Sequence, residues 1–321
     1  MLTESPVLHL GLAGFSNEEQ ELLDQLLLQA GLGGIVWQSV AFEDADAWWI
    51  NGLRTTLHAD GALRIDPPVT YGRTFYLNLR EMDRPVAFSV PLRPQNFEPA
   101  YRFDTASQAS MNDVLDTFEA LLGPVVAQFR LASQLLEHDS ALSAGIYHVK
   151  AHGTLLATVN LQGDTGVLPT AGPADFEDAI WSRQPEASHE IPKNFVRTSL
   201  AQLMWQYAVR TSRDVLPKRY RSGLIYFRRL PRVPQRLLKE THLLLLRELA
   251  SGPAGFDELR QRTGCDAAQL AHDIAALYLV GAVTSNPRRA TGAGPALGRR
   301  APSDTAPTLP HAATAHRRSL K

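Results

Sequence analysis

The chain has 321 residues, of which 44% are apolar and 20% charged, as in an ordinary globular protein with room for two or three hydrophobic cores. Its single cysteine, Cys265, excludes an intramolecular disulfide framework and a cysteine-rich zinc site. The net charge of −1 conceals an asymmetry: residues 1–140 carry 8 basic and 19 acidic residues, a net −11, whereas residues 141–321 carry 24 basic and 14 acidic residues, a net +10. The two parts therefore serve different charged partners or face each other.

Residues 1–140 alternate strand and helix patterns, which predicts an acidic α/β domain. VLHLGLAGF is typical of a strand, and Ser16 with Glu19 forms the capping-box pattern of a helix over residues 17–30. Further elements follow in order: strands at GIVWQSV and DAWWINGL, two strands around a turn at Met82 and Asp83, and a long helical region over residues 110–138.

This order of elements resembles a CheY-like receiver domain over about residues 5–125. The resemblance implies an acidic pair after the first strand and a phosphoacceptor aspartate at the end of the third. Here the first strand leads into Ala13, Gly14 and Phe15, and the third strand ends at Asn51. Without carboxylates there is no Mg²⁺ site, because this cation prefers charged oxygen ligands. Two interpretations stay open: a degenerate receiver, or an unrelated α/β domain without a switching role.

Residues 141–232 predict a small α+β domain that ends in a basic segment. GIYHVKAHGTLLATVNLQGDTGVLP alternates apolar residues between turns, as in an antiparallel meander. PADFEDAIW and KNFVRTSLAQLMWQYAVRT are amphipathic and predict two helices packed on that sheet.

The segment from Arg210 to Lys239 contains ten arginines or lysines and one acidic residue, Asp214, with aromatic residues among them. Arginine forks bind phosphate oxygens and aromatic rings can stack on bases, so the segment is the best candidate for a ligand or phosphate site. The candidate residues are Arg219, Arg221, Arg228, Arg229, Arg232 and Arg236. The alternative is that these arginines line a solvated linker or pair with the acidic N-terminal domain.

Arg232 and Arg236 form an R-x-x-x-R pattern that resembles the first half of the PilZ signature. That resemblance implies a cyclic dinucleotide ligand such as cyclic di-GMP. The second half of the signature, D-x-S-x-x-G, is absent downstream.

Residues 233–286 predict three helices with a glycine-containing turn and a strand-like end. Pro234 suits the first turn of a helix through LLKETHLLLLRELA, residues 256–263 form a second, and Asp266 caps a third, before AVTSN turns into a strand or wing. This arrangement resembles the winged helix-turn-helix domains of bacterial regulators over about residues 234–286.

The third helix of this module would read DNA in a winged helix, but it is acidic. Its spacing places Gln269, His272, Asp273 and Ala276 outward, and it contains no lysine or arginine. Base reading needs hydrogen-bond donors and tolerates few carboxylates beside phosphates, so we expect Gln269, His272 and Asp273 to contact a protein partner. Arginines outside this helix, Arg260, Arg262, Arg288 and Arg289, are left for contacts to a DNA backbone.

Residues 287–321 are rich in Ala, Gly, Pro, Thr and Arg, which predicts a disordered basic tail. Common NTPase, hydrolase and zinc-enzyme motifs are missing, so we expect no catalytic residues, no metal and no cofactor. With no signal peptide and no apolar run near 18 residues, a cytoplasmic protein that does not bind membranes is expected.

Together these features predict a non-enzymatic bacterial regulatory or adapter protein that acts through protein contacts, with an anionic ligand at the arginine-rich segment. Two alternatives are a DNA-binding transcriptional regulator and a cyclic-dinucleotide effector. The predicted fold is α/β plus α+β, with a receiver-like N-terminal domain, a small middle domain, a winged helix and a tail.

Overall fold

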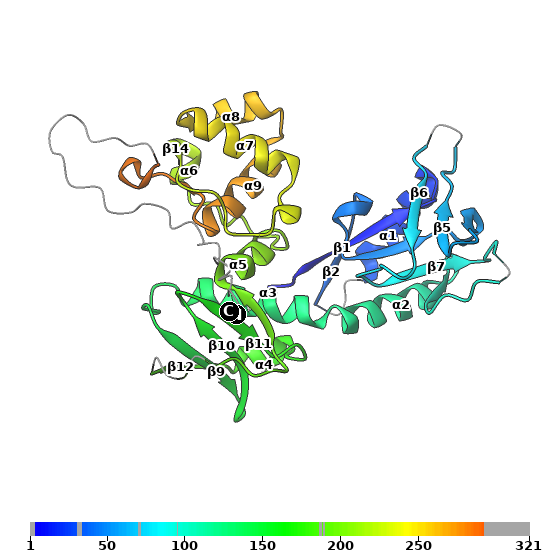
Figure 1. The fold of residues 1–321 in the computed structure, drawn as a ribbon, viewed down its shortest axis with the longest axis horizontal. Coiled ribbons are helices and arrows are strands. Elements are labelled where there is room, and N and C mark those ends of the chain that lie inside the picture. The colour runs from blue at the N-terminus through cyan, green and yellow to red at the C-terminus, as the bar shows by residue number, and fades with distance from the viewer. Residues whose placement is uncertain are drawn as a thin grey trace, which may run out of the picture.

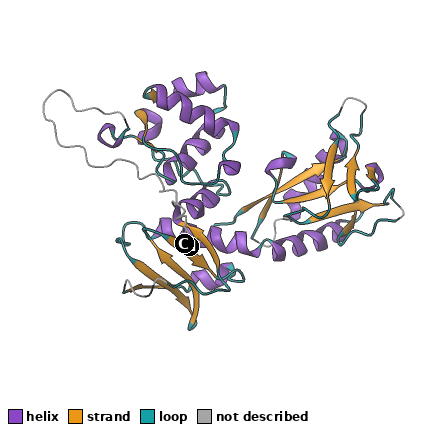
Figure 2. Cartoon of the chain, in the orientation of Figure 1, coloured by secondary structure: helices purple, strands orange, loops and turns teal. Residues whose placement is uncertain are grey.

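Three packed units make up the chain in the computed structural model (Figures 1 and 2). The structure describes residues 4–30, 34–69, 72–94, 96–185, 188 and 190–291. Nothing in this part of the chain is a helix long and apolar enough to cross a membrane. The architecture is mixed α/β, as predicted.

Five parallel strands form the main sheet of the N-terminal unit, in the order β2-β1-β3-β7-β8. Their bounds are β1 (Val7–Ala13), β2 (Val36–Val40), β3 (Ala47–Ile50), β7 (Val86–Val90) and β8 (Arg102–Asp104). The strand order changes direction between β1 and β3, and in parallel sheets ligands bind beyond the carboxyl ends of the strands at such a point.

The two faces of this sheet are covered differently. Helices α1 (Asn17–Ala30) and α2 (Gln108–Leu121) pack on one face, around Trp37 and Trp49. The other face is covered by a small antiparallel sheet of β4 (Thr55–Leu57), β5 (Ala62–Ile65) and β6 (Phe75–Asn78). The two strands predicted around Met82 and Asp83 therefore exist as β6 and β7, but they belong to different sheets.

The predicted helical region over residues 110–138 is two helices. Helix α2 ends at Leu121, and α3 (Gly123–Glu137) continues from it into the middle unit (Figure 1). Phe129 and Leu131 of α3 lie in the core of the middle unit, so the predicted boundary at residue 140 falls after a helix that this core needs.

The middle unit is a five-stranded antiparallel sheet in the order β12-β9-β10-β11-β13, and the predicted meander supplies three of these strands. The strands are β9 (Ile146–Ala151), β10 (Thr154–Asn160), β11 (Asp164–Val167), β12 (Ile180–Gln184) and β13 (Val196–Ser199). With α3, the helices α4 (Pro173–Glu177) and α5 (Leu200–Ala208) pack on one face. Both predicted helices are shorter than expected, because parts of the two amphipathic segments form β12 and β13.

The described residues of the C-terminal unit form four α-helices, two 3-10 helices and a three-stranded sheet in the order β15-β14-β16. Its elements are α6 (Arg219–Ser222), β14 (Leu224–Phe227), the 3-10 helix η5 (Gln235–Leu237), α7 (Glu240–Ser251), β15 (Ala254–Gly255), α8 (Phe256–Thr263), α9 (Ala267–Leu279), β16 (Val283–Thr284) and the 3-10 helix η6 (Pro287–Arg289). The central strand β14 precedes α7, so the predicted boundary at residues 232 and 233 cuts through a packed core. The predicted tail starts with η6, and its residues from 292 onward lie outside the described part.

Helix α5 joins the middle and C-terminal units, because its side chains belong to two cores. Leu203, Met204 and Tyr207 pack with the middle sheet, whereas Trp205 and Ala208 lie in the core of the C-terminal unit beside α9. The two units therefore share helix α5.

Ion pairs connect the acidic N-terminal unit to the residues that follow α5 and to the start of α7. Arg210 binds Asp46, Arg213 Nε lies 3.3 Å from Glu4, and Lys239 Nζ lies 3.1 Å from Asp44. Buried Glu4 also accepts hydrogen bonds from the hydroxyls of Tyr207 (2.9 Å) and Thr211. Pairing between the two oppositely charged parts of the chain thus involves three cations of the basic segment.

Candidate anion-binding site

A pocket of about 480 Å³ opens on the outer side of the C-terminal unit. Its walls come from α6, the end of β14, the end of α9 and the chain from Gly281 to Arg289. Three arginines from separate elements, Arg219, Arg228 and Arg289, line it together with Tyr220 and Tyr278.

None of these three arginines forms an ion pair within the described residues, and no carboxylate lines the pocket. The guanidinium carbon of Arg219 lies 5.5 Å from the ring centroid of Tyr220 and 5.8 Å from that of Tyr278, so the two rings support this side chain. Burial raises the pKa of Tyr220, which therefore stays protonated at neutral pH. The pocket presents cations and neutral donors, a chemistry that suits an anion.

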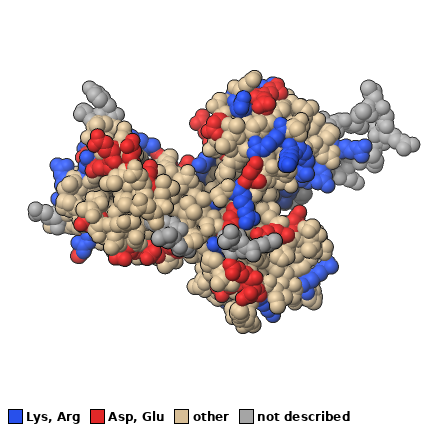
Figure 3. Space-filling view, turned by 180° about the vertical axis from the view of Figure 1, so that it is seen from behind, with Lys and Arg blue, Asp and Glu red and all other residues tan. Residues whose placement is uncertain are grey.

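One further arginine, Arg229, lies beside Gly281 at the rim of the pocket. Burial, and then the charges of Arg228 and Arg232, lower the pKa of Arg229. The Nη2 atom of Arg229 donates to the Val280 carbonyl at 3.4 Å. Arg229 and Arg232 form no ion pair with a carboxylate within the described residues. In Figure 3, Lys and Arg side chains gather on the same unit, at the upper right.

The six arginines proposed from the sequence do not form one site. Arg219 and Arg228 line the pocket, Arg229 lies beside it at Gly281, and the charge of Arg232 acts on Arg229. Arg221 is paired elsewhere, because its Nη2 atom lies 2.6 Å from Asp214 and its guanidinium carbon lies 5.4 Å from the ring centroid of Phe256.

Arg236 acts electrostatically on a residue of the N-terminal unit, Asp83. The pKa of Asp83 is lowered mainly by its hydrogen bond with Arg84, and the charge of Arg236 contributes to the same shift. Neither Arg232 nor Arg236 lines the pocket. The R-x-x-x-R resemblance therefore does not correspond to a shared pocket.

The predicted partner-binding face of α9 is largely buried. Gln269 is exposed, His272 is half-buried, and Asp273 and Ala276 are fully buried. The prediction was wrong for Asp273 and Ala276 because α5 covers this side of α9. Since nearly every position of α9 is apolar or buried, the helix lies between two layers instead of on the outside.

Asp273 forms a buried pair with His242 of α7. The His242 Nε2 atom lies 3.2 Å from Asp273, and His242 Nδ1 accepts the Lys239 backbone N–H at 3.0 Å, which fixes the proton on Nε2. Burial would raise the pKa of Asp273, but the neighbouring His242 imidazole and the hydrogen bond that Gln269 donates outweigh it and lower the pKa. The pair has no access to solvent and holds two helices together.

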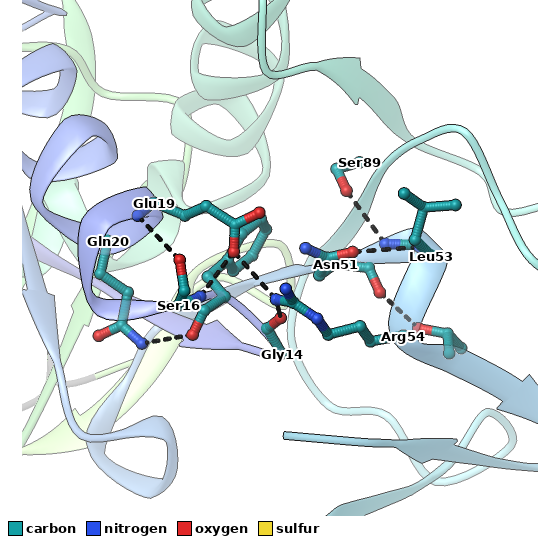
Figure 4. Close-up of polar contacts among 11 residues, drawn as sticks. Gly14, Ser16, Glu19, Gln20, Asn51, Leu53, Arg54 and Ser89 are labelled. Carbon is teal, nitrogen blue, oxygen red and sulfur yellow. Dashed lines mark hydrogen bonds and ion pairs between the residues drawn. The ribbon is translucent and has the colours of Figure 1, made fainter. Parts of the chain in front are cut away.

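At the carboxyl ends of β1 and β3, the position where a receiver-like sheet would bind its ligands, the polar groups are paired internally (Figure 4). Arg54 fills this position, donating to the Gly14 carbonyl and to Glu19, whose carboxylate is 2.9 Å away. Glu19 also closes the predicted capping box with Ser16.

The other side chains at this end are occupied as well. Asn51, which follows β3 as predicted, accepts the Leu53 backbone N–H at 3.1 Å, and Ser89 accepts that of Gly52 at 3.0 Å. The described residues contain no group of three His, Cys, Asp or Glu side chains that could hold a metal ion. The polar groups at the carboxyl ends of β1 and β3 are therefore already hydrogen-bonded within the protein. The pocket of the C-terminal unit is the better candidate for a ligand site.

Comparison with known proteins gives no match to a family model, a curated protein or a solved structure. The pocket also contains residues that sequence reasoning did not connect. Arg289 was predicted only to contact a DNA backbone, and Tyr278, Ser285 and Asn286 were not predicted as site residues. No motif links these positions to Arg219, because the fold alone brings them together.

Proposed function

We propose that this protein is a non-enzymatic regulatory or adapter protein that binds a phosphate-bearing ligand through its C-terminal unit and acts on protein partners. The observation that carries the proposal is the convergence of Arg219, Arg228 and Arg289 on one pocket without a carboxylate. The planar guanidinium group can form two hydrogen bonds to phosphate oxygens. A bound anion also lowers the electrostatic repulsion between cations that lie close together without a carboxylate partner.

The chemistry of the pocket supports binding more than catalysis. Arginine does not accept protons near neutral pH, and Tyr220 keeps its proton. The single cysteine supports a reducing compartment such as the cytoplasm.

The fold is consistent with a regulatory module. Helices α7, α8 and α9 with a three-stranded sheet support the C-terminal unit as a variant of the winged helix-turn-helix, in which β14 replaces the usual second strand of the wing. The parallel order β2-β1-β3-β7-β8 is that of flavodoxin-like sheets, which supports a receiver-like origin of the N-terminal unit. The one-sided helix cover and the closed position at Arg54 depart from a working receiver.

Removing the two pocket arginines Arg228 and Arg289 should strongly weaken the binding of a phosphate-bearing ligand. Each charge-assisted hydrogen bond contributes about 1.5 to 3 kcal/mol, so Arg228→Ala with Arg289→Ala should weaken pyrophosphate binding about 100-fold or more, as measured by calorimetry on the full chain. Arg260→Ala is the matched control, because Arg260 is an exposed arginine of the same unit outside the pocket. Equal affinity in the double variant and the control, or no binding by the wild type, would contradict the proposal.

A DNA-binding regulator is the second candidate, favoured by the position of Arg228 and Arg229 next to Arg288 and Arg289 at one edge of the unit. Such a protein would contact only the DNA backbone, because α5 covers the helix α9 that would otherwise read the bases. Four phosphate contacts predict that the logarithm of the binding constant falls with that of salt with a slope of about −3.6. A shift assay on random duplex that shows no binding at low salt would exclude this candidate.

A further inference from the structure

We propose that the pocket takes a small ligand with at least two phosphate groups, bound at two neighbouring positions near Gly281. This inference rests on the proposed function and specifies its ligand. The inner position is formed by Arg219, Arg228 and Arg289, and the outer position by Arg229, whose guanidinium lies beside that of Arg228 at Gly281.

The first argument is a β-bulge that directs two consecutive arginines to one place. Just beyond the end of β14, the backbone N–H groups of Arg228 and Arg229 both donate to the Ala282 carbonyl, at 2.9 and 3.2 Å, which is the hydrogen-bond pattern of a β-bulge. Consecutive side chains of a regular strand point to opposite faces, and a bulge changes this.

The result of the bulge is visible at Gly281. A Cβ atom added there would lie 3.1 Å from Arg229 Nη2 and 3.2 Å from Arg228 Nη1, so both guanidinium groups meet above this glycine. Gly281 has a φ of +69°, a conformation that favours glycine, which leaves the space for them. Two like charges are thus held together beside an open pocket, with no carboxylate between them.

The second argument is size. A water molecule takes about 30 Å³ of the liquid, so a pocket of about 480 Å³ holds far more than one phosphate group. One phosphate carries a charge of about −1.5 to −2, which is about half the charge of the four arginines Arg219, Arg228, Arg229 and Arg289, so two phosphates match them better.

The remaining groups of the pocket suit the organic part of such a ligand. The Tyr278 hydroxyl and the side-chain amide N–H groups of Asn286 donate no hydrogen bond within the described chain. They are free to bind a sugar or a base edge. A nucleoside diphosphate combines these features, whereas each phosphodiester of a dinucleotide carries only one negative charge. A concave pocket also fits a small molecule better than a duplex.

The test is calorimetry on the full chain with inorganic phosphate, pyrophosphate, ADP, cyclic di-GMP and a random 20-base-pair duplex. We expect pyrophosphate or ADP to bind at least tenfold more tightly than phosphate. Arg229→Ala should remove most of that gain while leaving phosphate binding within about twofold, and Arg260→Ala should change neither. Unchanged melting temperatures would show that both variants fold.

The outcomes separate the two proposals. If phosphate and pyrophosphate bind equally, or if Arg229→Ala leaves pyrophosphate binding unchanged, the two-phosphate inference is wrong while the anion pocket stands. If the duplex binds more tightly than all small ligands and with a steep salt dependence, the ligand is a nucleic-acid backbone and the inference is overturned. If no anion binds, the proposed function itself fails.

Discussion

Replacing Trp205 with alanine should lower the free energy of unfolding by about 3 to 5 kcal/mol, the usual effect of removing a large buried aromatic side chain. Trp205 is 1% exposed, and its ring contacts His242 edge to face with centroids 4.8 Å apart. The side chain lies where α5 covers α9, so its loss leaves a cavity between the middle unit and the C-terminal unit. Urea denaturation followed by circular dichroism measures the effect.

Two controls make this result specific. Trp205→Phe keeps an aromatic ring in the core and should cost clearly less than the alanine variant. Leu243→Ala removes a 43%-exposed leucine from α7 and should change stability by less than about 0.5 kcal/mol. A loss below about 1 kcal/mol for Trp205→Ala would mean that α5 does not close this side of α9 in solution.

Lowering the pH from 6.5 to 4 should destabilise the protein through His9, by on the order of 3 kcal/mol. Burial is the main cause that lowers the pKa of His9 from 6.5 to about 4, and the charges of Arg210 and Lys239 act in the same direction. Asp46 and Asp44 oppose the shift. At neutral pH the ring is therefore uncharged, although it lies 3.8 Å from Asp46.

The direction follows from the two pKa values. Below pH 6.5 the unfolded chain binds a proton at His9 that the folded chain does not bind until about pH 4, so stability present above pH 6.5 is lost across this range. His9→Gln removes this titration, and the difference in stability between wild type and variant should change by the same amount. Parallel stability curves from pH 6.5 to pH 4 would show that His9 is not buried beside Arg210.

Local patterns predicted much of the fold. Ser16 and Glu19 form the expected helix cap, Asn51 follows the third strand, and the meander of the middle unit is present. These features depend on residues close in sequence. The two strands around Met82 and Asp83 are present as β6 and β7, but a turn between two strands does not decide which sheet each of them joins.

The interpretation of α9 was wrong for a different reason. Its polar positions suggested an outer face, but Asp273 is compensated by His242 from another helix, and a partner of this kind cannot be read from one helix. The apolar residues around the whole helix were the available signal of burial between two layers.

The arginine-rich segment was predicted as a region but not as a site. Its composition indicated cations, while the fold divides them among ion pairs to the N-terminal unit, an internal pair at Arg221 and the pocket. The bulge at Arg228 and Arg229 depends on Ala282, more than 50 residues later, so no local pattern reveals it.

The most direct test of the anion pocket is nuclear magnetic resonance of the arginine Nε–H groups during titration with pyrophosphate. Assigned signals of Arg219, Arg228 and Arg289 should shift together and saturate at one ligand concentration, while Arg260 stays unchanged. Arg54 reports on the closed position of the N-terminal unit and should also stay unchanged. Shifts at Arg54 alone, or no shift at the three pocket arginines, would contradict an anion-binding site in the C-terminal unit.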